Sequence, residues 1–190
     1  MKSLLIVLVA CLGLVGCAGV SVQDYAKDSP KLDLRQYFDG RINGWGMVQD
    51  RSGKVLRRFV VRIDARWQGE KGVLEEHFDW SDGKTEFRRW EIEKRGDSYV
   101  GTAGDVVGQA AGSAAGNALQ WRYTLALPVD GRTWHVQMDD WMYLIDDATL
   151  ANRTSMRKFG LEVAEISIFF RRETAPGTGE GSVVAPSAPR

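Results

Sequence analysis

The fold is decided by the stretch FVVRIDARW at residues 59–67. Apolar side chains occupy every second position of this stretch, and the positions between them are mostly charged. A period of two is typical of a β-strand that buries one face. The same alternation recurs at residues 121–127 and 134–144. The sequence therefore favours a fold built mainly from half-buried strands.

Turn signals separate the expected strands. Short stretches that contain Gly or Asp recur between the alternating segments, and each is typical of a tight turn. They lie at residues 50–53, 68–72, 81–83, 95–97, 129–131 and 158–160. We therefore predict about eight or nine strands joined by hairpins as an antiparallel up-and-down barrel, whose interior is either filled or holds one small ligand. An open, strongly curved sheet is the alternative.

A glycine-rich stretch at residues 101–117 interrupts the β pattern. Glycine recurs at every fourth position, and Ala or Val fills most positions between. The repeated glycines are Gly104, Gly108, Gly112 and Gly116. At helical spacing they lie along one face, where another backbone can approach closely. We expect a short helix packed on the barrel, with a flexible lid over the mouth or a membrane-dipping element as alternatives.

The N-terminus has the pattern of a bacterial lipoprotein signal. Lys2 precedes an apolar run from Leu4 to Val15, which is typical of a secretory signal peptide. The run ends in Leu-Val-Gly-Cys at residues 14–17, which resembles a lipobox, whose cysteine takes a diacylglycerol thioether with acyl chains such as palmitate. An uncleaved transmembrane anchor and a soluble secreted form are the alternatives. Ala18 lacks the aspartate that retains many such proteins at the inner membrane, so this resemblance implies the periplasmic face of the outer membrane.

Four segments follow from these patterns. Residues 1–16 form the signal peptide, and residues 17–30 carry the lipidated Cys17 and a polar tether. Residues 31–173 form the barrel, and residues 174–190, rich in Pro, Gly, Ser and Ala, form a disordered tail. Cys11 leaves with the signal peptide, so the mature domain contains no disulfide.

Composition excludes several classes of function. The chain has 25 basic and 25 acidic residues, so it has no basic excess for binding nucleic acid. His77 and His135 lie far apart, and no phosphate-binding loop, dinucleotide fingerprint or nucleophile elbow is present. We therefore predict no cofactor and no metal, and we favour a non-enzymatic function over an enzyme.

A polar group is expected inside the barrel. Alternation places Asp140 on the apolar face of its strand, and Asn152 and Thr154 would meet it from the next strand. Arg88 is a possible counter-charge. The group could anchor a ligand head group in an apolar cavity, or it could be a satisfied buried network, or a bulge could turn Asp140 outward. The candidate ligand-binding residues are Arg88, Trp121, Tyr123, Asp140, Asn152 and Thr154.

Two family resemblances add to this interpretation. The stretch from Trp121 to Ile166, with shorter matches at residues 105–108 and 116–118, resembles the domain of unknown function 3833 family of Gram-negative lipoproteins. No activity is established for that family; its members often lie beside genes for cyclopropane fatty acid formation, which implies a lipid-related role by association.

The second resemblance, a more distant one, is to lipocalins. Gly44-Trp45-Gly46 lies near the start of the first strand, and Arg171 or Arg172 follows the last, as in lipocalins, where the Arg packs on the Trp. Asn43 departs from the lipocalin pattern, which has Gly there. This similarity implies a lipocalin-like barrel.

Three functional hypotheses follow. The first is a periplasmic binding module, held on the membrane by Cys17, that holds a fatty acyl chain or phospholipid. The second is a structural or assembly lipoprotein that docks through its glycine stripe, and the sequence identifies no protein partner for it. The third is a lipid-modifying enzyme that uses Asp140 or Glu165 as acid or base.

Overall fold

The stretch at residues 59–67 forms the middle of strand β2 (Val55–Gln68), as predicted. Phe59, Val61, Ile63 and Ala65 are buried, and Val60, Arg62, Asp64 and Arg66, which alternate with them, are exposed. This alternation gives β2 one face toward the core and one toward solvent. The computed structural model describes residues 19–173 of the chain.

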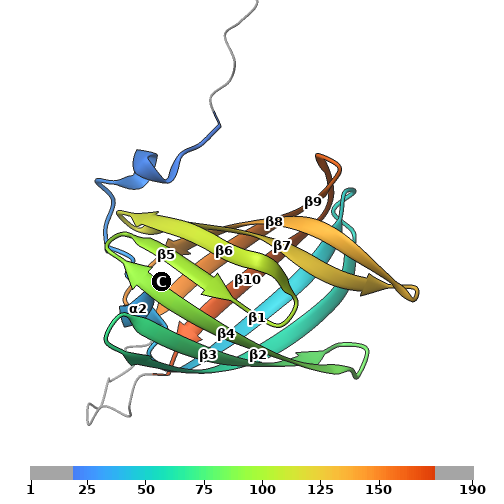
Figure 1. Cartoon of the computed structure of the whole chain (residues 1–190), viewed down its shortest axis with the longest axis horizontal. Coiled ribbons are helices and arrows are strands. Elements are labelled where there is room, and N and C mark those ends of the chain that lie inside the picture. The colour runs from blue at the N-terminus through green and yellow to red at the C-terminus, as the bar shows by residue number, and fades with distance from the viewer. Residues whose placement is uncertain (1–18, 174–190) are drawn as a thin grey trace, which may run out of the picture.

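Ten antiparallel strands in this range close into one barrel (Figure 1). Each strand pairs with its neighbours in the chain, and β1 closes the ring against β10. The other strands are β1 (Gly40–Asp50), β3 (Lys71–Trp80), β4 (Thr85–Arg95), β5 (Ser98–Thr102), β6 (Val106–Ala115), β7 (Ala118–Val129), β8 (Arg132–Leu144), β9 (Thr149–Lys158) and β10 (Leu161–Arg172). The predicted antiparallel barrel is confirmed, but the predicted strand number of eight or nine is wrong.

The glycine-rich stretch is a strand, so the predicted helix is wrong. Most of residues 101–117 form β6 and the end of β5. A Cβ atom on Gly112 would lie 2.6 Å from the Trp121 ring, and one on Gly101 would lie 3.0 Å from it. Ala110 and Ala114 are buried on the same wall. Small residues are needed here because the Trp121 side chain fills the space, and a spacing of four keeps residues on one face of a strand as well as of a helix.

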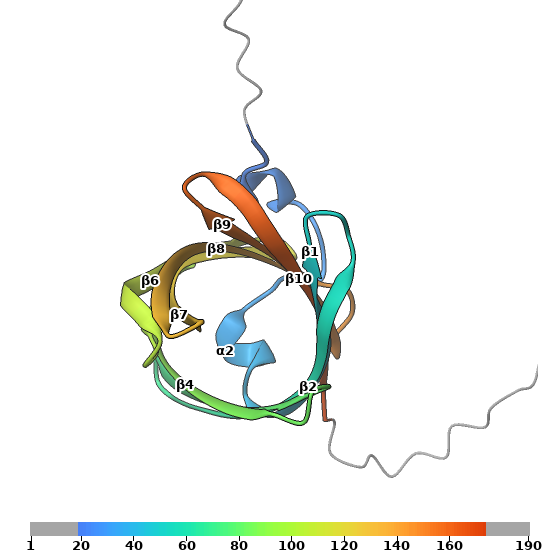
Figure 2. The ribbon, with the colours of Figure 1, turned by 90° about the vertical axis from the view of Figure 1, so that its right-hand side faces the viewer.

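A short helix closes one end of the barrel. Helix α2 (Leu34–Tyr37) lies across that end, and Figure 2 shows it at the far end of the barrel, seen from the open end. Leu34, Tyr37 and Phe38 are all buried. The Trp67 indole N–H donates to the Phe38 carbonyl oxygen at 2.7 Å, which fixes the helix to β2. The opposite end, where the β1–β2, β3–β4, β7–β8 and β9–β10 turns lie, has no such plug among the described residues.

The segment before α2 lies against the barrel. The 3-10 helix η1 (Val22–Tyr25) buries Val22, and its Tyr25 carbonyl occupies the space where Gly116 lacks a side chain. The Leu32 amide donates to the Gly116 carbonyl at 2.8 Å. Within the segment predicted as a tether, η1 is thus packed against β6 and β7. Cys17, the predicted signal peptide and the predicted tail at residues 174–190 lie outside the described residues.

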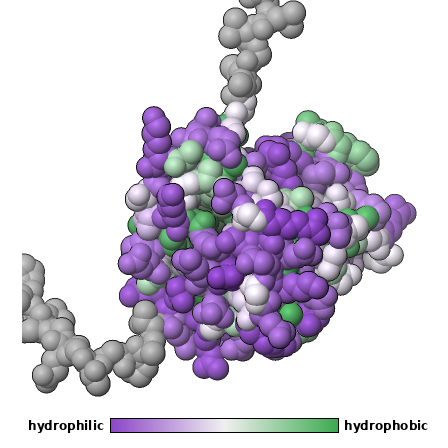
Figure 3. Space-filling model, turned by 60° about the vertical axis from the view of Figure 1, so that its left-hand side comes forward, coloured by the Kyte–Doolittle hydropathy of each residue, from purple (hydrophilic) through white to green (hydrophobic). Residues whose placement is uncertain are grey.

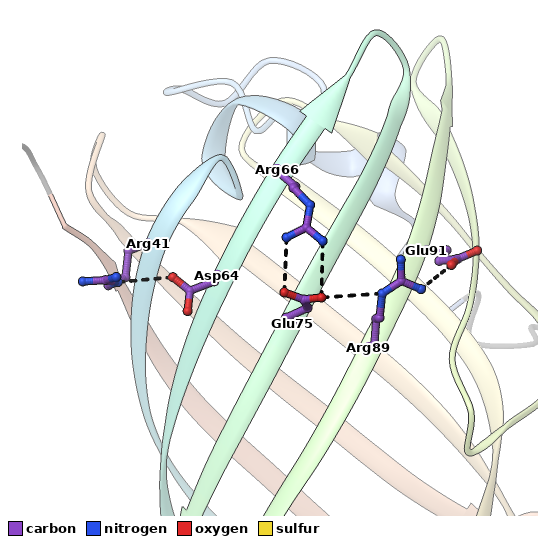
Figure 4. A network of polar contacts seen from close by, with 6 residues as sticks. All are labelled: Arg41, Asp64, Arg66, Glu75, Arg89 and Glu91. Carbon is purple, nitrogen blue, oxygen red and sulfur yellow. Dashed lines mark hydrogen bonds and ion pairs between the residues drawn. The ribbon is translucent and has the colours of Figure 1, made fainter.

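The outer face of the barrel carries many charges. Arg66 on β2, Glu75 on β3 and Arg89 on β4 form a row of ion pairs across adjacent strands, as Figure 4 shows. The surface around the closed end is also mostly hydrophilic (Figure 3). Within residues 19–173, no helix is both long enough and apolar enough to cross a membrane. The buried apolar side chains form a core inside the barrel, where they surround the site.

Candidate functional site

The barrel encloses a cavity of about 330 Å³. It extends from Leu34 and Phe38 at the closed end to Leu56 and Leu127 near the open end. The volume falls within the range of small-molecule sites, about 300 to 1,000 Å³, and the lining is mostly apolar, as is typical of such sites. The interior is therefore partly hollow, which the sequence left open.

Aromatic side chains form one wall of the cavity. Trp90 lies edge-on to Trp121 and to Tyr123, with ring centroids 5.8 and 5.4 Å apart. Both predicted ligand-binding aromatics, Trp121 and Tyr123, line the cavity. They project from β7, where the predicted alternation holds, and Gly101 of β5 and Gly112 of β6 leave room for Trp121. The aromatic wall thus depends on large side chains on β7 and on small residues on the neighbouring strand β6.

Asp140, Asn152 and Thr154 meet inside the barrel, as predicted. They are 7%, 6% and 3% exposed, and all three line the cavity. Asp140 lies directly opposite Thr154 in a β8–β9 register without a bulge, so the alternative that turned Asp140 outward is wrong. The Thr154 hydroxyl donates to Asp140 Oδ1 and also lies 3.2 Å from Asn152 Oδ1. Asn152 donates its amide to the Trp141 carbonyl at 3.2 Å.

Arg88 also lines the cavity, but its hydrogen bonds go to a residue that the sequence did not single out as a partner. Its Nη2 and Nε lie 2.7 and 3.0 Å from Asp105 Oδ2. Asp105 lies in the β5–β6 turn, so this ion pair joins β4 to the tip of that hairpin. The other oxygen of Asp105, Oδ1, is buried and has no hydrogen-bond partner within residues 19–173.

Glu76 is a cavity residue that the sequence reasoning missed. It lies on β3 directly opposite Arg88, which bonds Asp105 instead. Burial raises the pKa of Glu76 to about 7; Arg88 opposes this change, and Asp105 and Asp140 add to it. Its alternation with Leu74 and Phe78, which also line the cavity, was the signal that could have identified it.

Burial likewise raises the pKa of Asp140 to about 6. The Thr154 hydrogen bond and the positive charge of Arg88 oppose this rise, while the Asp139 charge adds to it. Burial also raises the pKa of Tyr123 well above its ordinary value, so Tyr123 remains neutral. Removal from water disfavours the charged form of each acid, which explains the common direction.

Strand pairing around the barrel is interrupted at its open end, between residues 85–90 of β4 and residues 127–129 of β7, and this interruption is called the notch. The β5–β6 hairpin is too short to fill it: β5 begins to pair with β4 only at Glu91, and β6 pairs with β7 no further than Leu125. The Asp105 carbonyl accepts the last bond, from the Ala126 amide at 2.8 Å. Exposed apolar residues surround this end, namely Leu56, Phe87, Trp134, Phe159 and Leu161.

The expected Arg–Trp packing of lipocalins is absent from the described part of the chain. Trp45 is half exposed on the outer face, opposite Phe169, and the Arg172 guanidinium lies over the Tyr37 ring at 6.0 Å. His77 and His135 are exposed. Among the described residues, no three His, Cys, Asp or Glu side chains are grouped as metal ligands.

Comparison with known proteins tests the predicted resemblance. No curated protein matches the chain. A family model described as "Protein of unknown function (DUF3833)" matches residues 11–172, which include every strand of the barrel. The resemblance to this family is therefore confirmed, and the chain belongs to the DUF3833 family of proteins of unknown function.

Proposed function

We propose that the chain is a membrane-anchored lipoprotein that holds a single apolar or amphiphilic ligand inside its barrel. The observation that carries this proposal is the cavity of about 330 Å³, which lies between the α2 plug and the open end. A filled interior would have suited a purely structural barrel, whereas a lined, partly hollow one suits a binding protein.

The composition of the cavity wall favours an alkyl chain. Phe59, Phe78, Trp90, Ile166 and Phe170 all line it, so an apolar ligand would exchange water for apolar contacts. Each buried methylene contributes about 0.8 kcal/mol, before the loss of translational freedom is subtracted. A single acyl or alkyl chain therefore supplies enough free energy for useful affinity.

The proposed lipid anchor would place this cavity close to a source of apolar ligands. A diacylglycerol thioether on Cys17, with the signal peptide removed, would hold the barrel at the periplasmic face of the outer membrane, where apolar ligands are available. The exposed apolar residues at the open end, Phe159 and Leu161 among them, would lie on the path of a ligand entering from lipid. The glycine stripe proposed for protein docking is part of the barrel wall, so it does not support the assembly hypothesis.

Native mass spectrometry of the chain purified from its own host tests the binding function. We expect a bound molecule of lipid mass that is released on unfolding. A matched variant, Trp90→Ala, enlarges the cavity and should change the set of ligands retained. A ligand-free protein, combined with no binding of any alkyl probe, would overturn the proposal.

A further inference from the structure

The polar side chains in and beside the cavity include more hydrogen-bond acceptors than donors. Three carboxylates, those of Glu76, Asp105 and Asp140, lie around one guanidinium, that of Arg88. Within residues 19–173, Arg88 forms its ion pair with Asp105 alone. When ionised, the group therefore carries an excess of negative charge in an apolar enclosure.

The hydrogen bonds show the same imbalance. Thr154 has one hydroxyl proton but two acceptors within reach, Asp140 Oδ1 and Asn152 Oδ1. Asp140 is more than nine-tenths buried; Thr154 donates to its Oδ1, and the Tyr123 hydroxyl also hydrogen-bonds its carboxylate. Glu76, which also lines the cavity, has no hydrogen bond from another side chain within residues 19–173, so a donor on the ligand would complete the bonding of this group.

We propose that the cavity selects an amphiphile with one alkyl chain and a cationic, hydrogen-bond-donating head group such as a primary ammonium. This inference rests on the proposed binding function and specifies its ligand class. An ammonium supplies three N–H donors and one positive charge, which match the carboxylate of Glu76 and the remaining lone pairs of Asp140.

A carboxylate head group is disfavoured at the same place. It would add a fourth negative charge beside Glu76, Asp105 and Asp140, in surroundings that screen charge poorly. Arg88 is already paired with Asp105 through its Nε and Nη2, so its single positive charge is shared with that carboxylate. Arg57, the other basic residue of the lining, is paired with Asp82 near the open end, and Glu86 adds negative charge to the lining.

The test compares three probes with the same decyl chain: decylammonium, decanol and decanoate. The closed barrel, its plug and its core all lie within residues 19–173, so residues 18–190 without lipid contain every element that the described fold needs. Binding is measured by calorimetry at about pH 8, where the amine is protonated and the acid ionised. We expect decylammonium to bind about ten- to a hundredfold more tightly than decanoate, with decanol between them.

Isosteric variants locate the preference. The double variant Glu76→Gln with Asp140→Asn should bring decylammonium and decanoate within about threefold of each other while decanol affinity is kept. The matched control, Glu75→Gln with Asp139→Asn, alters the neighbouring carboxylates, which form ion pairs with Arg66 and Arg122 on the outer face, and should leave the preference intact.

The outcomes separate the two proposals. Decanoate binding as tightly as decylammonium, while decanol also binds, would overturn the head-group assignment and leave the binding function standing. A preference that disappears in the control variant would assign amine binding to the outer face and would also overturn it. Failure of all three probes to bind would overturn the binding function itself.

Discussion

Strands β2 and β6 belong to one barrel but reach the same structure for different reasons. Large apolar residues alternate with charges along β2, so its own sequence specifies a strand. Strand β6 is built mainly from Ala, Gly and Val, and it buries Ala110 and Ala114 where Trp121 of β7 fills the interior. The alternation of its own residues specifies β2 as a strand, whereas packing against neighbouring strands specifies β6. Substitutions should therefore disrupt the two strands through different mechanisms.

The largest effect is expected at Gly112 on β6. Gly112→Leu should lower the free energy of unfolding by about 4 kcal/mol or more, because its Cβ would meet the Gln120 carbonyl and the Trp121 ring, and backbone cannot yield. Urea unfolding followed by far-ultraviolet circular dichroism measures this. The control is Gly104→Leu, where a Cβ would meet no atom within 4 Å, and it should change stability little. Equal losses would show that β6 does not depend on the packing of Trp121.

On β2 the expected loss is smaller because it arises from a cavity. Ile63 is 1% exposed, and Ile63→Ala should cost about 2 to 4 kcal/mol. Val60, on the outer face of the same strand, is 37% exposed, and Val60→Ala should cost less than about 1 kcal/mol. Similar values for the two would contradict the alternation that we assign to β2.

Asp140 on β8 shows that the barrel interior also affects ionisation, because burial changes the pKa of its carboxyl group. Burial raises its pKa from 3.8 to about 6, so the folded state binds the proton more tightly than the unfolded state. Its contribution to stability is therefore complete below about pH 4 and is lost as the pH rises through about 6. Asp140→Asn should match the parent chain at about pH 4 and exceed it by about 1 to 3 kcal/mol at about pH 8.

Thermal unfolding across this pH range measures the difference. Asp139→Asn is the matched control, because Asp139 accepts hydrogen bonds from Gln120 and Arg122 instead of facing the cavity. A gain at high pH in both variants would mean that general charge reduction, and not burial of Asp140, explains the result.

The smallest effect is expected on the outer face of β3. Glu75 contacts Arg66 and Arg89 in the ion-pair row of Figure 4, but water competes for all three. Glu75→Gln should shift the urea midpoint less than any of the interior variants, and added salt should remove the shift. A larger shift than that of Ile63→Ala would place the main determinant of stability outside the barrel.

How much the sequence could predict follows from the same comparison. Alternation in the sequence predicted the correct faces for residues of β2, β7 and β8, and it predicted that Asp140, Asn152 and Thr154 lie together. It succeeds because successive side chains of a strand point to opposite faces of the sheet. It could not identify β6, because Ala and Gly have low intrinsic preference for strands and Trp121, the side chain that explains them, belongs to β7.

The remaining features depend on contacts between distant segments. Helix α2 is only one turn long, and its position is fixed by Trp67 and Tyr99 from other elements. Asp105 looked like an isolated charge among small residues until folding brought it against Arg88. Glu76 was within reach of the alternation argument, since Leu74 and Phe78 flank it on the same face, but nothing in the sequence shows that burial raises its pKa.

The notch at the open end determines how easily this barrel can change shape. Along most of the wall, separating two strands breaks a ladder of backbone hydrogen bonds. Between residues 85–90 of β4 and residues 127–129 of β7 no strand pairing joins the two sides, and the Arg88–Asp105 ion pair fastens the edge of the gap. Widening the rim at this point would therefore break one side-chain ion pair and no strand pairing, whereas widening it elsewhere would break part of the β-sheet.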